Sequence, residues 1–270
     1  MPDAAATWSP APDLDRRLAG TRFHEIRRFA RVDSTNRHLL SEAARGGREG
    51  IVAVADEQTA GRGRHGRTWS AAPGAALLVS VLLRPDLPSE RLHLVTLAAG
   101  IAAAEAVQEV AGLNARLKWP NDLVVDDRKL AGILAETTGT GSAGTGTGGT
   151  GGVVVGMGLN LRSDDFPAEI VELATACDRH SAREVDRSEL LVAWLHALDR
   201  RLGALDEVVA AASARSATLG RRVRVELTLD AFDGVATGMT SEGYLVVTRD
   251  DGAEQIVTAG DVVHLRPTVG

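Results

Sequence analysis

The chain has 270 residues, of which 44% are hydrophobic and 24% are charged. This composition is ordinary for a folded globular protein and excludes a disordered or fibrous chain, and the length allows one or two domains. The formal net charge of −6 excludes the overall positive charge that is typical of nucleic-acid-binding proteins.

No secretion signal or membrane-spanning segment is visible in the sequence. Residues 1–18 lack the apolar core of a signal peptide. The most apolar run, residues 97–110, is too short to span a membrane and contains Glu105 and Gln108, which favours a buried helix. The single cysteine, Cys177, excludes an intramolecular disulfide and fits a reducing compartment. We therefore expect a cytoplasmic protein.

The first two thirds of the chain alternate between strand and helix patterns after an Ala/Pro/Asp-rich arm or short helix at residues 1–20. Ser34 or Asp33 is expected to cap the first long helix. Apolar runs bounded by turn residues predict strands at 23–29, 51–55, 77–83, 113–119, 123–125, 129–136 and 153–161. Helical spacing predicts helices at 36–45, 91–110, 167–179 and 187–212.

Two later segments differ in character from the rest. Residues 139–152 contain eight Gly and four Thr, and no Lys or Arg that could hold a phosphate, so a flexible connector is the favoured interpretation. After residue 216, short strands alternate with turn residues, which predicts a small barrel and a domain boundary near residue 217. These strands are expected at 221–227, 232–239, 244–248, 255–257 and 262–265.

The segment 61–66 reads Gly-Arg-Gly-Arg-His-Gly and matches the dinucleotide-binding pattern G-x-G-x-x-G. No helix pattern follows its last glycine, so the context that would place a pyrophosphate at a helix N-terminus is missing. Arg62, Arg64 and Arg67 instead indicate a mobile loop that binds a polyphosphate or an acyl phosphate. A solvated basic loop is the alternative.

A second constellation surrounds the two lysines of a chain that otherwise uses arginine. Residues 126–128 are predicted to form a turn, and two strands joined by a tight turn would present Lys118, Asn121, Asp122 and Lys129 near one end of a sheet. A lysine is needed where a compact charge fits and a planar guanidinium does not. Gly132 within a strand indicates close approach of a ligand or backbone. The alternative is an exposed hairpin with ordinary surface charges.

Together, these motifs resemble the biotin protein ligase family. The resemblance rests on residues 58–67, 118–122 and 128–134, with further support from 33–36 and 156–160 in the expected order, and it covers residues 23–266. It implies an α+β fold: a catalytic domain similar to class II aminoacyl-tRNA synthetases over residues 1–217, then an SH3-like barrel over 218–270. The 32 residues before the first motif are too few for the DNA-binding domain of some members, so no repressor function is expected.

The resemblance also implies the reaction and its partners. The enzyme would activate biotin with ATP and Mg²⁺ to biotinyl-5′-AMP and transfer biotin to one lysine of the carrier domain of acyl-CoA and pyruvate carboxylases. No nucleic-acid or membrane partner is expected. The rival interpretations are a lipoate or octanoate transfer enzyme, a non-catalytic biotin sensor and a nucleotide-binding oxidoreductase. The sequence leaves the oligomeric state open.

Site roles follow from the resemblance residue by residue. The catalytic residues would be Lys129, Arg62, Arg64 and Arg67. Biotin would contact Ser34, Thr35, Asn36, Gln58, Gly61, Arg62, Gly63, Arg64, Lys129 and Gly132. ATP would contact Arg64, Arg67, Lys118, Asn121, Asn160 and Arg266. Asp122 would orient the carrier lysine or lie near the metal.

Other chemistry-bearing residues are expected to be structural. The seven histidines show no zinc-binding spacing, so no structural metal site is expected. Trp69, Trp119 and Trp194 are interpreted as packing residues, and Cys177 as an inert helix residue.

Overall fold

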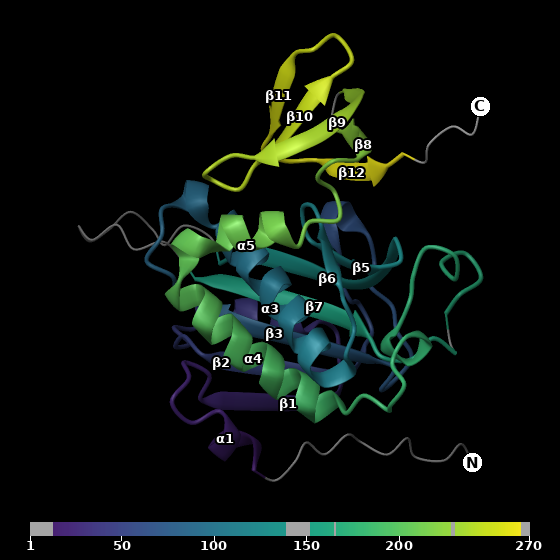
Figure 1. Ribbon diagram of the computed structural model, residues 1–270. Helices are drawn as coiled ribbons and strands as arrows, with labels where there is room; N and C mark the ends of the chain where they lie inside the picture. The colour runs from purple at the N-terminus through teal and green to yellow at the C-terminus, as the bar shows by residue number, and fades with distance from the viewer. Residues whose placement is uncertain (1–12, 139–151, 165, 228–229, 266–270) are drawn as a thin grey trace.

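The computed structural model describes residues 13–138, 152–164, 166–227 and 230–265. These residues form a large mixed sheet covered by helices and a smaller antiparallel sheet packed against its end (Figure 1). The large sheet has the strand order β1-β2-β3-β7-β6-β5-β4. Its strands are β1 (Glu25–Val32), β2 (Ile51–Gln58), β3 (Ala76–Leu83), β4 (Arg116–Lys118), β5 (Asp122–Val125), β6 (Arg128–Thr137) and β7 (Val153–Asn160). Only the β1–β2 pair among these is parallel.

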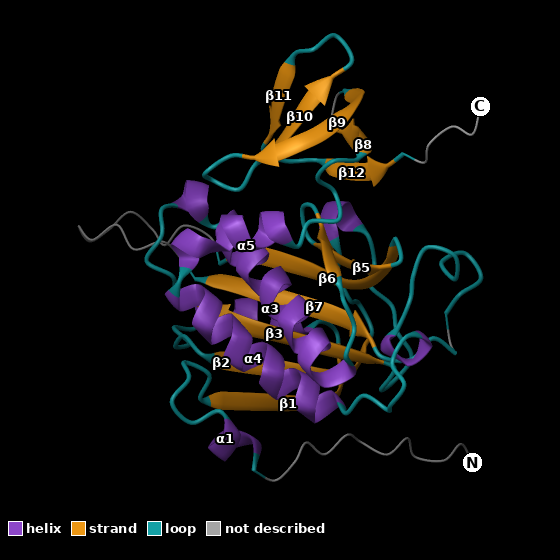
Figure 2. Ribbon diagram, viewed as in Figure 1, coloured by secondary structure: helices purple, strands orange, loops and turns teal. Residues whose placement is uncertain are grey.

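Helices cover both faces of this sheet. Successive residues of its central strands point to opposite sides, so these apolar strands present an apolar surface on each face. On one face, Val52 and Val54 of β2 join the core beneath α3 (His93–Ala111) and α4 (Arg187–Gly203) (Figure 2). On the other face, Ile51 and Ala53 pack against α2 (Thr35–Ala44). The shorter helices α1 (Leu14–Arg17) and α5 (Val208–Ala214) pack at the edge of the first core. Sheets buried on both faces explain the continuous apolar runs in the sequence.

Helix α3 is long and apolar enough to cross a membrane, the one such helix among the described residues. Its apolar surface is nevertheless largely enclosed by the protein, with thirteen of its residues buried. The indole N–H of the fully buried Trp194 donates to the Ala99 carbonyl of this helix at 3.2 Å. The core helix predicted over the apolar run 97–110 is confirmed.

The smaller sheet has the order β11-β10-β9-β8-β12 and is antiparallel throughout. Its strands are β8 (Arg222–Glu226), β9 (Ala231–Met239), β10 (Leu245–Arg249), β11 (Glu254–Val257) and β12 (Asp261–His264). Trp119, which follows β4, inserts into the core of this sheet. Its backbone N–H donates to Thr218 Oγ1 at 3.1 Å and its indole N–H to the Gly243 carbonyl at 3.4 Å. Trp119 is thus one of the residues that connect the smaller sheet to the end of the large one.

Two predicted helices are wrong or incomplete. The segment 167–179 contains turns and a short 3-10 helix (Cys177–Arg179) in place of a helix. After the turns the chain pairs with β6 around Ala174, because Lys129 N–H donates to the Leu173 carbonyl and Thr175 N–H to the Lys129 carbonyl, both at 2.8 Å. The predicted helix 187–212 is interrupted after Gly203, so that α4 and α5 are separate. Most of the glycine-rich connector, 139–151, lies outside the described residues.

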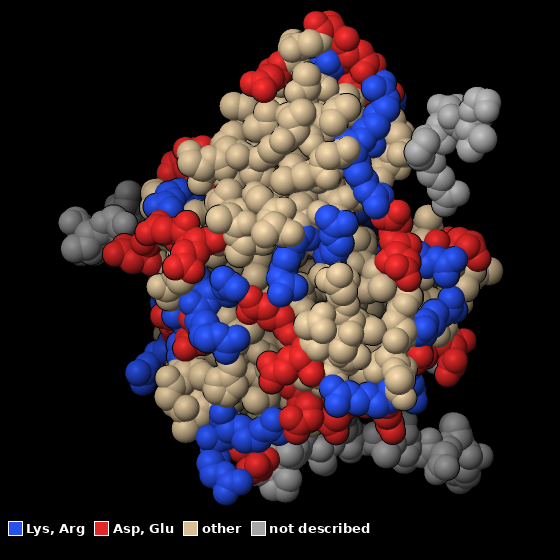
Figure 3. All heavy atoms as spheres, viewed as in Figure 1, with Lys and Arg blue, Asp and Glu red and all other residues tan. Residues whose placement is uncertain are grey.

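Acidic and basic side chains are mixed over the face shown in Figure 3. Ion pairs place arginines next to carboxylates, as in Arg17–Glu189 at 2.6 Å and Arg22–Asp199 at 2.7 Å. Pairs that solvent reaches, such as Arg17–Glu189, each contribute at most about 1 kcal/mol to stability. Most of the net charge of these surfaces is therefore balanced locally by ion pairs.

Candidate active site

A cavity of about 230 Å³ opens where the two sheets meet, and nearly all the motifs of the sequence converge on it. It is bordered by the start of α2, the end of β2, the arginine-rich loop, the β4–β5 turn, β6, β7 and β12. The predicted residues that line it are Ser34, Thr35, Asn36, Gln58, Arg62, Gly63, Arg64, Arg67, Lys118, Asn121, Asp122, Lys129 and Gly132. Residues as far apart in sequence as Ser34 and Lys129 therefore form one site.

One end of the cavity is polar and buried. Ser34 caps α2 as predicted, accepting a hydrogen bond from the Arg37 backbone N–H at 3.4 Å. Gln58 Oε1 accepts from the Thr35 backbone N–H at 2.8 Å. Ser34, Thr35 and Asn36 are at most 5% exposed. Buried hydrogen-bonding groups of this kind select a ligand whose donors and acceptors match them.

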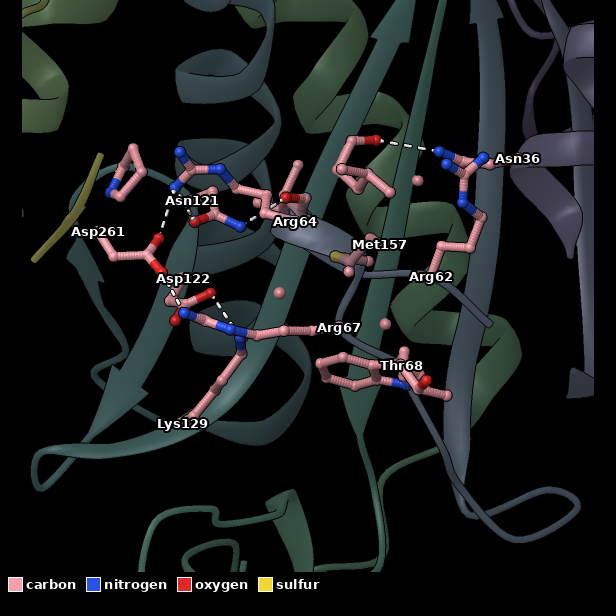
Figure 4. Close-up of a pocket in the computed structure, with 18 of the residues that line it drawn as sticks. Asn36, Arg62, Arg64, Arg67, Thr68, Asn121, Asp122, Lys129, Met157 and Asp261 are labelled. Carbon is pink, nitrogen blue, oxygen red and sulfur yellow. Dashed lines mark hydrogen bonds and ion pairs between the residues drawn. The ribbon is translucent and has the colours of Figure 1, made fainter. Parts of the chain in front are cut away.

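The arginine-rich loop is held by carboxylates (Figure 4). Arg62 pairs with Glu136 at 2.8 Å, and Arg64 lies 3.3 Å from Asp261 Oδ1 and donates to the Gly260 carbonyl at 3.1 Å. Arg67 also pairs with Asp261. Burial is the main cause that lowers the pKa of Arg64 below its ordinary value. Because Glu136 belongs to β6 and Asp261 to β12, both sheets supply a carboxylate that holds this loop.

The β4–β5–β6 meander brings the two lysines to the same cavity. Asp126 and Asp127 adopt φ values of 50° and 61°, the left-handed conformations of a tight hairpin turn, as the sequence predicts. Lys129 Nζ lies 2.7 Å from Asp122 Oδ1. Burial lowers the pKa of Lys118 below its ordinary value. An ammonium paired with one carboxylate at a cavity wall can exchange that partner for an anionic ligand.

Trp69, which is predicted to be a packing residue, lines the cavity. Its ring lies against two backbone positions without side chains: a Cβ added to Gly158 would lie 2.3 Å from the ring, and one added to Gly132 would lie 3.1 Å from it. Lys129 Nζ is 5.7 Å from the ring centroid. The indole thus forms an apolar wall next to the cationic centre. Trp194 is confirmed as a packing residue, whereas Trp119 both packs and borders the cavity.

Three predicted site residues are not among those that line the cavity. Gly61 closes the arginine-rich loop, where its carbonyl accepts from Trp69 N–H at 3.0 Å. Asn160 is buried at the end of β7 and donates to the Thr175 carbonyl at 3.0 Å. Arg266 lies outside the described residues. Conversely, Asp261 and Glu136 were missed, because nothing in their local sequence marks them as partners of a distant loop.

Other reactive groups are arranged as structural residues. Burial raises the pKa of the Cys177 thiol to about 12, which leaves it protonated and unreactive, as predicted. The helix in which Cys177 lies is a short 3-10 helix. Over the part of the chain that the structure describes, no group of three or more His, Cys, Asp or Glu side chains is arranged to hold a metal ion.

His264, which lies near Lys118, should make the free energy of unfolding depend on pH. Burial and the neighbouring Lys118 lower its folded-state pKa to about 4, below the ordinary value of 6.5. Between pH 6.5 and 4, the imidazole of His264 is protonated in the unfolded chain but not in the folded one. The free energy of unfolding is therefore unaffected by this group above pH 6.5 and decreases as the pH falls from 6.5 to 4. We expect a loss of about 1–2 kcal/mol from this group in denaturant unfolding between pH 7 and 4.5, after discounting for partial exposure. His264→Gln should flatten this part of the profile, and an unchanged slope in the variant would contradict the assignment.

Comparison with known proteins identifies the family. The family model described as the biotin/lipoate A/B protein ligase family matches residues 28–155, and that of the biotin protein ligase C-terminal domain matches 218–265. The chain is 36% identical to the biotin–[acetyl-CoA-carboxylase] ligase of Mycobacterium tuberculosis, over 94% of this chain and 97% of that protein. It is 31% identical to the enzyme of the same name from Paracoccus denitrificans, over 87% and 98%.

A solved structure agrees with these sequence relatives. Biotin protein ligase from Aquifex aeolicus in complex with biotin and ATP superposes with a TM-score of 0.77 at 26% identity, covering 90% of this chain and 100% of that one. The first family model includes lipoate enzymes, but the C-terminal model and the full-length relatives are those of biotin enzymes. The resemblance carried by the sequence motifs is confirmed: the chain belongs to the biotin protein ligase family.

Proposed function

We propose that this cavity performs both half-reactions of biotin ligation. The biotin carboxylate oxygen attacks the α-phosphorus of ATP, and pyrophosphate leaves with the bonding electrons to give biotinyl-5′-AMP. A carrier lysine amine then attacks the carbonyl carbon, AMP leaves, and the amine loses its proton as the amide forms. The observation that best supports this is the convergence of five cationic side chains on one cavity with a buried polar end.

The polar end suits the ureido ring of biotin. Ser34, Thr35, Asn36 and Gln58 supply neutral donors and acceptors there. The apolar thiophane ring and valeryl chain would then lie along Trp69 and the open backbone at Gly132, with Gly61 and Gly63 allowing the loop to close over them. This orientation directs the biotin carboxylate toward Lys129.

The cationic centre suits the meeting of two anions. A carboxylate and a triphosphate repel each other, so the enzyme must neutralise both and hold them in line. Lys129 would bridge the biotin carboxylate and the α-phosphate, with Arg62, Arg64 and Arg67 folding over them. Lys118, Asn121, Asn160 and Arg266 are proposed on the ATP side. Lys129 would exchange its present partner Asp122 for substrate oxygens, and Arg64 and Arg67 would likewise exchange Asp261.

Mg²⁺ would enter as part of the ATP substrate. The residues fit this role, because Asp122 Oδ1 is a buried carboxylate oxygen paired with Lys129, and Asn121 adds an amide oxygen at the same wall. Once Lys129 turned toward substrate, Asp122 would need another cation nearby, either the metal or the incoming carrier ammonium. The ion would neutralise phosphate charge during the first step.

The remaining assignments follow the same interpretation. We assign residues 1–217 to a catalytic domain similar to class II aminoacyl-tRNA synthetases and residues 218–270 to an SH3-like barrel. The acceptor would be the carrier domain of acetyl-CoA carboxylase and of related acyl-CoA and pyruvate carboxylases in the cytoplasm. The two relatives named above are both acetyl-CoA-carboxylase ligases.

Exchange of labelled pyrophosphate into ATP tests the proposed first step directly. We expect exchange that requires biotin and magnesium, because formation of the adenylate is reversible before a carrier is added. Lipoate in place of biotin should give none, since its dithiolane ring offers no ureido group to the polar end. Exchange with lipoate alone would overturn the substrate, and a folded, biotin-binding protein that exchanges with neither acid would favour a sensor.

A further inference from the structure

A buried chain of hydrogen bonds lies behind the polar end of the cavity. Its centre is Ser80 on β3, which is fully buried and which the sequence motifs did not include. Ser80 Oγ lies 2.6 Å from Thr35 Oγ1 and 2.6 Å from Asn36 Oδ1. Ser80 is opposite Gly156 on β7, where any Cβ would lie 2.0 Å from Asn36 Oδ1. The backbone is therefore shaped to admit this contact.

The far end of the chain fixes which way the Asn36 amide points. Asn36 Nδ2 donates to Glu136 Oε2 at 2.8 Å and to the Leu134 carbonyl at 3.2 Å. A carboxylate and a carbonyl only accept, so the amide nitrogen must face them and the amide oxygen must face Ser80. Glu136 is itself anchored by Arg62 at 2.8 Å.

Counting hydrogens then fixes both hydroxyl groups. Ser80 has one hydroxyl hydrogen, and it must go to Asn36 Oδ1, which cannot donate. The 2.6 Å contact between Ser80 and Thr35 then requires the hydrogen of Thr35. Thr35 Oγ1 is also 3.0 Å from Gln58 Oε1, so two hydroxyl hydrogens are available for three oxygen–oxygen contacts. The two contacts at 2.6 Å are short enough to require a hydrogen between the oxygens, whereas the 3.0 Å contact is not.

We propose that Ser80 is a positioning residue that turns the Thr35 hydroxyl into an acceptor toward the cavity, so that the site selects a head group carrying an N–H donor. The proposal rests on the proposed function, because a ureido N–H of biotin is the donor it would receive. A hydroxyl whose hydrogen is committed to Ser80 presents only lone pairs to the ligand. A dithiolane or other head group without N–H leaves that buried acceptor unpaired, which weakens its binding.

The test compares binding of biotin with that of its two cyclic carbamate analogues, in each of which one ureido N–H is replaced by a ring oxygen. Calorimetry gives the dissociation constants for the wild-type chain and for Ser80→Ala. In the wild type, biotin should bind more tightly than the analogue lacking the N–H that meets Thr35. In Ser80→Ala the Thr35 hydroxyl is free to donate to the new ring oxygen, so this preference should fall about tenfold.

Ser216→Ala is the matched control, because Ser216 is also buried but its hydroxyl accepts from the Thr218 and Leu219 backbone N–H groups away from the cavity. Its preference for biotin should equal that of the wild type. Comparing two ligands on one folded protein separates recognition from stability. An unchanged preference in Ser80→Ala for both analogues would overturn the role of Ser80 alone. A wild-type chain that does not bind biotin would overturn the proposed function and the inference together.

Discussion

Lys129→Ala is expected to lower biotin-dependent pyrophosphate exchange by about a thousandfold, mainly through the rate at saturating substrates. Removing one preorganised charge that meets the developing charge of a transition state typically costs 10²–10³ in rate. The cost here is at the upper end because Lys129 would contact both reacting anions. Its loss would also leave the Asp122 carboxylate, now 2.7 Å from the ammonium, unpaired beside the incoming phosphate.

Two further variants make the Lys129 result specific. Lys129→Arg should also lose most of the activity, because a planar guanidinium is too wide to lie between two anions that must come into contact. Arg128→Ala is the matched control: Arg128 is the neighbouring cation on β6, but it pairs with the exposed Glu172 at 3.3 Å, away from Asp122. It should retain wild-type exchange. Loss of less than tenfold in Lys129→Ala would contradict a bridging role.

The large sheet could be predicted in outline from local patterns, because each signal is contained within a few residues. The cap at Ser34 and the turn at Asp126–Asp127 are examples. The helix predicted at 167–179 is wrong, because the spacing of apolar residues shows only which structure the segment favours by itself. Backbone hydrogen bonds between Lys129 and the segment Leu173–Thr175 hold that stretch extended, and such long-range pairing leaves no local trace.

The site residues also fall into those that local motifs identify and those that distant elements supply. The loop and hairpin motifs bring their residues to the cavity, because each motif carries its chemistry within about ten positions. Asp261 could not be predicted, since it meets Arg64 only after the smaller sheet has packed against the large one. Trp69 was assigned to packing because the two glycines that accommodate its ring lie on β6 and β7, far from it in sequence. Partners supplied by other elements are thus what spacing cannot reveal.

Gly158→Ala is expected to lower the kcat/KM of pyrophosphate exchange about a hundredfold, because the new methyl group would lie 2.3 Å from the Trp69 ring. The central strand β7 is hydrogen-bonded on both sides and will not move, so the indole must shift into the cavity that substrates occupy. A misplacement of about 1 Å at a catalytic centre can cost 10²-fold in rate.

Combining this change with Trp69→Ala separates steric displacement of the ring from general damage to the strand. Trp69→Ala alone should also reduce exchange, since it removes an apolar wall. In that background, however, the methyl group at position 158 has nothing to displace, so Gly158→Ala should cost less than about threefold, a strong departure from additivity. Gly238→Ala on β9, where an added Cβ would have no neighbour within 4 Å, should be neutral in both backgrounds. If Gly158→Ala lowered kcat/KM by the same factor with and without the indole, the effect of the methyl group would come from β7 itself. That result would contradict the proposal that Gly158 positions the Trp69 ring in the cavity wall.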